Sequence, residues 1–286
     1  ASLQPDQFTY SAAITACANS RRTNQAVALL DRMASHDVRP NIFSYGALIS
    51  ACEKGHRWAH ALSLLVVMRQ CRVLPDLVTY NSAITACEKG HEMQWALAVF
   101  SHMLQENIEP DVITYNGLIS ACEKSHYWEE ALTYLYRMPR RTLAANVITY
   151  SAAISACEKG EQWVSALSIF AEMASKCVAA NVITFSALVS ACEKGEQTRK
   201  CLELLADMQR CSLQPSVITY NSVLQALLHE RQFCQALDML DRMIVQAVVP
   251  NHQTFGMLIA ESEIRGSLDQ EADLLGRLGI IVEDCQ

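Results

Sequence analysis

The most reactive side chains in this sequence are its twelve cysteines, and six of them recur at a constant interval. Neighbouring members of this set lie 35 residues apart: Cys17, Cys52, Cys87, Cys122, Cys157 and Cys192. A constant interval indicates one structural position used six times, with the copies about one repeat apart. A disulfide requires Cα atoms within about 7 Å, whereas packed helices lie about 8–10 Å apart. We therefore expect buried thiols in a reducing compartment.

No pattern in the sequence predicts catalysis or a bound cofactor. The zinc deaminase signature, H-x-E with P-C-x-x-C, does not occur in the sequence, and neither does a Gly-rich phosphate loop. His56 and His60 have the i, i+4 spacing of one helix face, but zinc takes three or four protein ligands and no third is implied. We therefore expect no enzyme activity, no cofactor and no metal site.

Composition restricts the class of protein. Hydrophobic residues make up 51% of the 286 residues and charged residues 19%, which argues against disorder. The formal net charge is −7, which counts against a strongly basic nucleic-acid domain. No apolar run reaches 18 residues, so we expect no membrane insertion. Ala1 replaces a start methionine, and we expect a fragment or a processed form, so a targeting segment could be missing.

A 35-residue repeat positions all of these side chains. The block P-D-L-V-T-Y-N begins at Pro75, and its relatives begin at Pro5, Pro40, Pro110, Ala145, Ala180, Pro215 and Pro250. An aromatic residue and a methionine recur at the same interval. The pattern predicts a single array over 1–286, with repeats 7–41, 42–76, 77–111, 112–146, 147–181, 182–216, 217–251 and 252–286, the last degenerate and cap-like.

Each repeat is predicted to contain two short helices. In the third repeat, an apolar stripe at helical spacing runs through Val78, Tyr80, Ala83, Ile84 and Cys87, and Gly90 is expected to end that helix. A second stripe runs through Trp95, Ala96, Val99, Phe100 and Met103. Neither helix can bury its stripe alone. Stacked neighbours would build one continuous core, so we expect an all-α, superhelical α-solenoid of tandem helix-turn-helix repeats.

The segment L-V-T-Y-N-S-A-I-T-A-C-E-K-G…W-A-L-A-V-F-S-H-M…I-E-P-D, from Leu77 to Asp111, resembles the consensus of pentatricopeptide-repeat (PPR) proteins. The tetratricopeptide signature W-x2-L-G-x2-Y is absent from the sequence. The resemblance implies a right-handed superhelix that binds single-stranded RNA, one base per repeat. It also implies a mitochondrial or plastid location and a role in RNA processing, stability, editing or translation.

The resemblance further implies which residues select bases. One selector follows the repeated aromatic residue, and the other is the last residue of the same repeat. The pairs are Ser11 with Asn41, Gly46 with Asp76, Asn81 with Asp111, Asn116 with Asn146, Ser151 with Asn181, Ser186 with Ser216, and Asn221 with Asn251. Gly256 with Gln286 would be an eighth pair, but it lies in the degenerate last repeat, at the end of the sequence. The implied bases run 5′ to 3′ as A, G, U, C or U, A, one unassigned base, then C or U. The alternative is a purely structural role, in which such Ser and Asn residues only cap helices.

An apolar base clamp is the second implied feature. It falls three residues before each first selector, at Phe8, Phe43, Val78, Ile113, Ile148, Ile183 and Ile218, and Gln253 ends the series. Flat apolar contacts to base faces hold single strands without sequence preference. The same residues could instead be ordinary core. The periodic Trp58, Trp128 and Trp163 are interpreted as packing residues.

A lysine series is a candidate for phosphate contact. It comprises Lys54, Lys89, Lys124, Lys159 and Lys194, eight residues past the first selectors and about 80° round an ideal helix. A glutamate precedes every one of these lysines, so the two sets cancel formally. The lysines could equally be solvated residues near the negative end of the helix dipole.

Two other functions remain open at this point. The acidic balance suits a structural scaffold subunit of a large organellar assembly, such as a ribosome, which would bind other organellar proteins instead of free RNA. A peptide-binding scaffold of the tetratricopeptide type is the third possibility. The restricted residue types at the selector positions favour RNA, because a scaffold has no reason to restrict them.

Overall fold

The computed structural model describes residues 5–20 and 22–266. These residues form fifteen α-helices, one short 3-10 helix and no strand. Each predicted repeat opens with a helix, and the first helices are α1 Gln7–Asn19, α3 Ile42–Lys54, α5 Leu77–Lys89, α7 Val112–Lys124, α9 Val147–Lys159, α11 Val182–Lys194, α13 Val217–His229 and α15 His252–Arg265. The second helices are α2 Thr23–Ser35, α4 Trp58–Gln70, α6 Met93–Gln105, α8 Trp128–Arg137, α10 Trp163–Ser175, α12 Thr198–Arg210 and α14 Phe233–Val245.

Almost all of these helices have the same length, because the sequence carries the same start and stop signals in each repeat. Most are 13 residues long. The exceptions are α15, which has 14 residues, and α8, which ends at Arg137 after 10 residues and is followed by the 3-10 helix Pro139–Arg141. Pro139 lacks the N–H that a continuing α-helix would need, so it ends the regular helix early. The second helix predicted for the eighth repeat lies outside the described residues.

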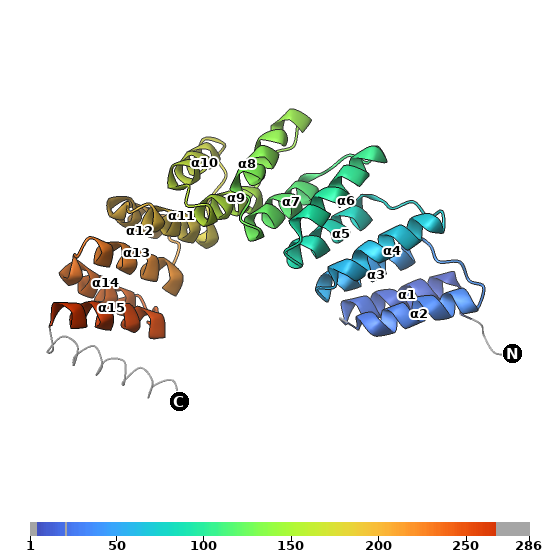
Figure 1. The fold of residues 1–286 in the computed structure, drawn as a ribbon, viewed down its shortest axis with the longest axis horizontal. Helices are drawn as coiled ribbons and strands as arrows, with labels where there is room; N and C mark the ends of the chain where they lie inside the picture. Colours follow the sequence, from blue (N-terminus) through green and yellow to red (C-terminus); the bar gives the residue numbers. More distant parts are fainter. Residues whose placement is uncertain (1–4, 21, 267–286) are drawn as a thin grey trace. The chain divides into compact units, whose positions relative to one another are not determined.

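The chain divides into two compact units, with the boundary between Ala156 and Cys157, inside α9. In the first unit, α1, α3, α5 and α7 pack on one another in sequence order (Figure 1). The second helices α2, α4 and α6 each pack on the first helix of their own repeat and on that of the next, and α8 packs on α7. In the second unit, α11, α13 and α15 pack in the same order, with α12 and α14 against them. The fold is therefore an all-α helical-repeat solenoid, as predicted.

The periodic aromatic residues and methionines form the core of both units. Tyr45, Tyr80, Tyr115 and Phe185 are at most 2% exposed, and Met68, Met103 and Met173 are fully buried. Two residues assigned to apolar stripes lie elsewhere, because Val78 is 68% and Trp95 50% exposed. Both predictions of burial were wrong, since each residue lies at the edge of its stripe, and Trp95 is only partly covered by the Trp58 ring of the preceding repeat, which stacks on it with 6.3 Å between ring centroids.

The helix α5 ends at Lys89 directly before Gly90, as predicted, but Gly90 does not take the left-handed conformation of a glycine cap. Its φ is −85°, and the following residue, His91, takes the left-handed conformation with φ 59°. The glycine is needed for space instead. A Cβ at Gly90 would lie 2.8 Å from Trp58 Cγ, and Gly195 has the same relationship to Trp163. The two tryptophans therefore pack against the next repeat, as interpreted from the sequence.

None of the described helices has the length and apolar character that crossing a membrane requires.

Candidate nucleic-acid interface

The second residue of each predicted selector pair caps the helix that opens the following repeat. The Asp111 carboxylate accepts at Oδ1 from the backbone N–H of Thr114 at 2.8 Å and from its hydroxyl at 2.9 Å. Six further residues accept from the equivalent backbone N–H: Asn41, Asp76, Asn146, Asn181, Ser216 and Asn251. Such a cap satisfies a helix-end donor that has no partner within the helix. The capping role and the predicted selector role therefore belong to the same residue.

Capping leaves one polar atom of each carboxylate or amide uncommitted. Every cap bond from Asp or Asn uses Oδ1, and within the described residues neither Oδ2 of Asp76 and Asp111 nor Nδ2 of the capping asparagines has a hydrogen-bond partner. Because Oδ1 meets N–H donors, the asparagine amide can only be oriented with Nδ2 pointing away from the helix end. A capping Asp thus offers an acceptor, whereas a capping Asn offers a donor.

Asp111 keeps its charge in this position. Burial raises the pKa of its carboxyl, but hydrogen bonds from the Thr114 N–H, the Thr114 hydroxyl and the Asn81 amide outweigh burial and hold the pKa below its ordinary value. A carboxylate that accepts several hydrogen bonds is stabilised in its ionised form. At neutral pH, Asp111 can therefore accept hydrogen bonds but cannot donate them.

The structure brings three of the seven predicted pairs into direct contact across 30 residues of sequence. Asn81 Nδ2 donates to Asp111 Oδ1 at 3.1 Å, and Asn221 Nδ2 donates to Asn251 Oδ1 at 3.3 Å. The hydroxyl of Ser11 lies 3.4 Å from Asn41 Oδ1. Gly46 contributes no side chain beside Asp76.

The remaining pairs are joined through a third residue or stand in separate units. Thr149 bonds both Asn116 and Asn146, and the Thr219 hydroxyl bonds both Ser186 and Ser216. Ser151 is buried in the first unit, and Asn181 caps α11 in the second.

Sequence reasoning missed the threonine or serine that joins these selectors. Thr114 is fully buried, and its hydroxyl lies 2.6 Å from Asn81 Oδ1 as well as 2.9 Å from Asp111 Oδ1. The equivalent residues are Ser44, Thr79, Thr149, Thr184, Thr219 and Thr254, and each is at most 1% exposed. A hydroxyl residue that recurs every 35 residues within a core helix was the available signal, because a buried hydroxyl requires a partner.

The predicted clamp residues are exposed, which excludes the alternative that they are core. Each is the second residue of a first helix, and the exposed fraction of the residue ranges from 60% for Ile148 to 81% for Phe8. Apolar side chains at this exposure, repeated at one helix position, are available to contact a flat partner.

A groove joins the clamp and the selectors at the first repeat. It has a volume of about 630 Å³ and lies between Phe8 and Phe43. Ser11, Asn41 and Thr15 also line it. The first predicted selector pair and the two flanking clamp residues therefore face one common space.

The lysine series is engaged in ion pairs between neighbouring repeats. Lys89 Nζ lies 2.9 Å from Glu53, Lys124 Nζ lies 2.6 Å from Glu88, and Lys194 pairs with Glu158. Lys54 donates to Asn19 Oδ1 at 3.0 Å. Lys89, Lys124 and Lys194 would have to leave, or share, a glutamate to meet a phosphate, so the phosphate role of the series stays a prediction.

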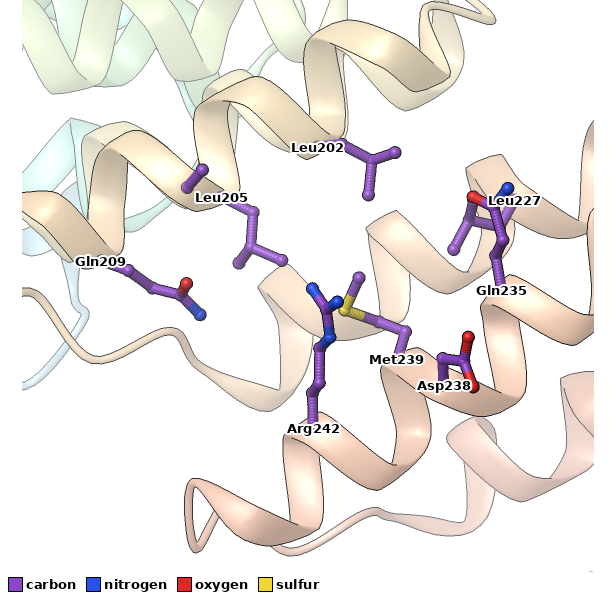
Figure 2. Close-up of a pocket in the computed structure, with 9 residues that line it drawn as sticks. Leu202, Leu205, Gln209, Leu227, Gln235, Asp238, Met239 and Arg242 are labelled. Carbon is purple, nitrogen blue, oxygen red and sulfur yellow. The ribbon is translucent and has the colours of Figure 1, made fainter.

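A second cavity lies away from all predicted site residues. It has a volume of about 410 Å³ between α12 and α14, and Figure 2 shows Arg242 and Met239 directed toward Leu205 across it. Gln209, Gln235 and Asp238 also line this cavity. It contains neither a selector nor a clamp residue.

The histidine pair noticed in the sequence does not share a helix. His56 lies in the turn between α3 and α4 with φ 54°, whereas His60 lies in α4. The assumed i, i+4 helical spacing was wrong, because α3 ends at Lys54. Among the described residues, no three His, Cys, Asp or Glu side chains gather in a metal-binding arrangement.

Family models match nearly the whole chain. The model of the PPR repeat family matches residues 5–54 and 75–124, and a PPR repeat model matches residues 43–73. The model of the pentacotripeptide-repeat region of PRORP matches residues 118–285. No curated protein matches the chain closely enough to count as a relative.

Solved structures with the same fold include two plant proteins. The pentatricopeptide repeat protein PPR10 from maize has a TM-score of 0.69 at 16% identity, over 98% of this chain and 45% of that one. PPR10 in complex with an 18-nucleotide psaJ RNA element has a TM-score of 0.62 at 17% identity, over 99% and 46%. The PPR domain of Arabidopsis thaliana PRORP1 in complex with tRNA has a TM-score of 0.56 at 16% identity, over 62% and 94%. The chain thus spans less than half the length of PPR10.

Proposed function

Because the chain belongs to the pentatricopeptide-repeat family, we propose that it binds single-stranded RNA along its first helices, with one base read by each selector pair. In this proposal the repeats bind RNA and do not catalyse a reaction. The neighbours whose structures contain an RNA element or tRNA support an RNA partner. We further propose a mitochondrial or plastid location and a role in transcript processing, stability, editing or translation.

The observation that carries the proposal is the uncommitted atom left by each cap. The pair Asn81 and Asp111 offers a donor from the amide and an acceptor at Asp111 Oδ2. Uracil presents a ring N–H between two carbonyl oxygens, so it accepts from the amide and donates to the carboxylate. Cytosine has an unprotonated ring nitrogen at that position. This nitrogen and the Asp111 carboxylate are both acceptors, so they would oppose each other. We therefore expect uracil at the third base.

The pair Asn221 and Asn251 is complementary to a different base. Asn251 is held at Oδ1 by Thr254, so its Nδ2 faces outward as a second donor beside Asn221. Two donors fit the ring nitrogen and carbonyl oxygen of cytosine, and they fit the oxygens of uracil less well. The seventh base is therefore expected to be cytosine in preference to uracil.

The clamp residues would hold the bases in place. Consecutive clamp residues stand on consecutive first helices and are exposed, so a base between two selectors can lie against apolar side chains on either side. Stacking of this kind contributes about 1–3 kcal/mol per base when the platform is aromatic. Phe8 and Phe43 are the aromatic members, so the first base should be the most tightly held.

A selection from a random single-stranded RNA library tests the proposal with purified protein. Enriched sequences should contain A-G-U, then C or U, A, any base, and C or U with C in excess at the seventh base, from 5′ to 3′. A chain with Asn81→Ala and Asp111→Ala provides the control, and its selected pool should lose only the preference at the third base. Recovery of no enriched motif by the unsubstituted chain would count against sequence-specific binding.

A protein scaffold in a large organellar assembly is the second candidate function. It is favoured by the ion pairs that occupy Lys89, Lys124 and Lys194, together with the net charge of −7, because they leave little positive field for phosphates. Crosslinking in cells separates the two functions. A scaffold would crosslink to proteins of one assembly, whereas an RNA reader would crosslink to RNAs that share the motif.

A further inference from the structure

We propose that the buried hydroxyl at the third residue of each first helix, represented by Thr114, sets the base preference of the selector pair in the preceding repeat. This inference rests on the proposed function, since it assigns a positioning residue to the same site. The threonine would not touch the base. It would act by fixing which polar atom of the first selector faces the groove.

The contacts of Thr114 span two repeats. Its hydroxyl lies 2.6 Å from Asn81 Oδ1 in the third repeat and 2.9 Å from Asp111 Oδ1 at the repeat boundary. The backbone N–H of Asp111 donates to the same hydroxyl at 3.2 Å. A hydroxyl has one proton to donate, so Asn81 Oδ1 and Asp111 Oδ1 share it, and the shorter distance makes Asn81 the main acceptor. Since Thr114 is fully buried, water cannot replace this donor.

The same contact recurs wherever the first selector has a polar side chain within one unit. Thr149 lies 2.6 Å from Asn116 Oδ1, and Thr254 lies 2.7 Å from Asn221 Oδ1. The Thr219 hydroxyl lies 2.7 Å from that of Ser186, and the Ser44 hydroxyl lies 2.9 Å from that of Ser11. Five independent copies indicate a feature of the repeat and not an accident of one side chain.

The hydroxyl and the cap together allow one orientation of the Asn81 amide. In the observed orientation, the amide oxygen accepts from Thr114, and the NH₂ group donates to Asp111 and keeps a second proton. A 180° rotation would place the amide oxygen against the Asp111 carboxylate, so two acceptors would face each other. Without the hydroxyl, the oxygen loses its donor, and the amide is held at one end only. The NH₂ group would then be presented to the base less consistently.

Thr79 provides a matched control within the same chain. Its hydroxyl lies 2.6 Å from Asp76 Oδ1, just as the Thr114 hydroxyl lies close to Asp111 Oδ1. The first selector of the preceding repeat, however, is Gly46, which has no side chain. A Cβ added at Gly46 would lie 3.6 Å from the Thr79 hydroxyl, so the geometry is equivalent while the amide is absent. Loss of the hydroxyl at Thr79 therefore removes only the bond to the capping carboxylate.

The experiment measures base-preference ratios in Thr114→Val, Thr114→Ser and Thr79→Val variants of the full chain. Binding is titrated with RNAs that differ only at the third base, U or C, and with RNAs that differ only at the second base, G or A. The Thr114→Val change should reduce the U-to-C ratio by roughly three- to tenfold, the value of one hydrogen bond. The Thr114→Ser change should keep the ratio, because Ser44 makes the same contacts. The Thr79→Val change should leave the G-to-A ratio within roughly twofold.

The outcomes separate this inference from the proposed function. If the wild-type chain binds the U and C RNAs equally, that result contradicts the proposed function and also this role of Thr114. A selective wild type whose ratio survives Thr114→Val, even with uniformly weaker binding, would overturn the inference alone. Circular dichroism checks that each variant is folded. If Thr114→Val does not fold, Thr254→Val provides the same test at the seventh base, because Thr254 makes the same bond to Asn221.

Discussion

Trp58 of the second repeat occupies the space that a side chain at Gly90 of the third repeat would need. This relationship predicts that Gly90→Ala destabilises the array, because the new Cβ would lie 2.8 Å from Trp58 Cγ. Overpacking of this kind costs about 1–3 kcal/mol. The midpoint of urea unfolding measures the effect.

The control for this prediction is Gly256, which lies inside α15 with no atom within 4 Å of a built Cβ. Gly256→Ala should stabilise the protein by about 0.5–1 kcal/mol, since alanine favours the helix. Combining Gly90→Ala with Trp58→Leu should cost less than the sum of the two single changes. Simple additivity in that double variant would show that the two residues do not share the space.

Asp111→Asn should move the preference at the third base from uracil toward cytosine. The cap bond at Oδ1 is kept, but the outward atom changes from an acceptor to a donor. We expect a change of about 1–3 kcal/mol in relative affinity, the range of a good paired contact in duplex DNA. Titrations against four RNAs that differ at this base measure it, and unfolding should hardly change, because Asn and Asp cap equally well.

Asp31→Asn is the matched control for that change. Asp31 is exposed on α2, outside the selector groove, and its substitution removes the same charge. It should leave the base preference as it is. Equal binding of all four RNAs by both the wild type and Asp111→Asn would favour the scaffold function.

Lys89→Ala should weaken all RNA sequences similarly if the lysine meets phosphates. The slope of the logarithm of the binding constant against the logarithm of the salt concentration should then become shallower by roughly 0.7, the value for one phosphate contact on a single strand. Glu53→Gln should have the opposite effect, because it releases Lys89 from the ion pair at 2.9 Å. An unchanged slope in both variants would restrict the lysine series to ion pairs between repeats.

The periodic cysteines should resist alkylation in the folded protein. Burial raises the pKa of Cys52, Cys157 and Cys192 to about 11, and that of Cys87 and Cys122 to about 12. The eleven described cysteines are free thiols, and four of them are exposed: Cys71, Cys177, Cys211 and Cys234. Peptide mapping after iodoacetamide treatment at pH 8 should find the exposed set modified first. Strong reductant should not change the melting temperature, and a large drop would indicate disulfides.

The same thiols predict a loss of stability at alkaline pH. An unfolded thiol ionises near pH 8.5, whereas the buried thiols ionise near pH 11 to 12. Their folded pKa is raised, so this contribution to stability is complete below about pH 8.5 and is lost as pH rises toward the folded pKa. Urea midpoints should fall between pH 8.5 and 11. A variant with Cys87→Ala and Cys122→Ala should fall less steeply over that interval.

Helix positions and much of the core followed from the sequence alone. A 35-residue period with an aromatic residue and a methionine in each copy defined two helices, and the helices α3, α5 and α7 begin at residues 42, 77 and 112, where the repeats were predicted to begin. Periodicity reports which residues share one helix face, because helical geometry is local. The selector and clamp positions came from the resemblance, and the caps and exposed side chains at those positions are consistent with it.

Contacts between repeats were decided only by the tertiary structure. The bond from Thr114 to Asn81, the ion pair from Lys89 to Glu53 and the packing of Trp58 on Gly90 all join residues 32 to 36 positions apart. Each depends on the offset and rotation with which one helix pair stacks on the next. A repeating sequence states that such residues recur, but it does not state which neighbour each one meets. The exposure of Val78 was decided in the same way, since stacking leaves the edge of its stripe uncovered.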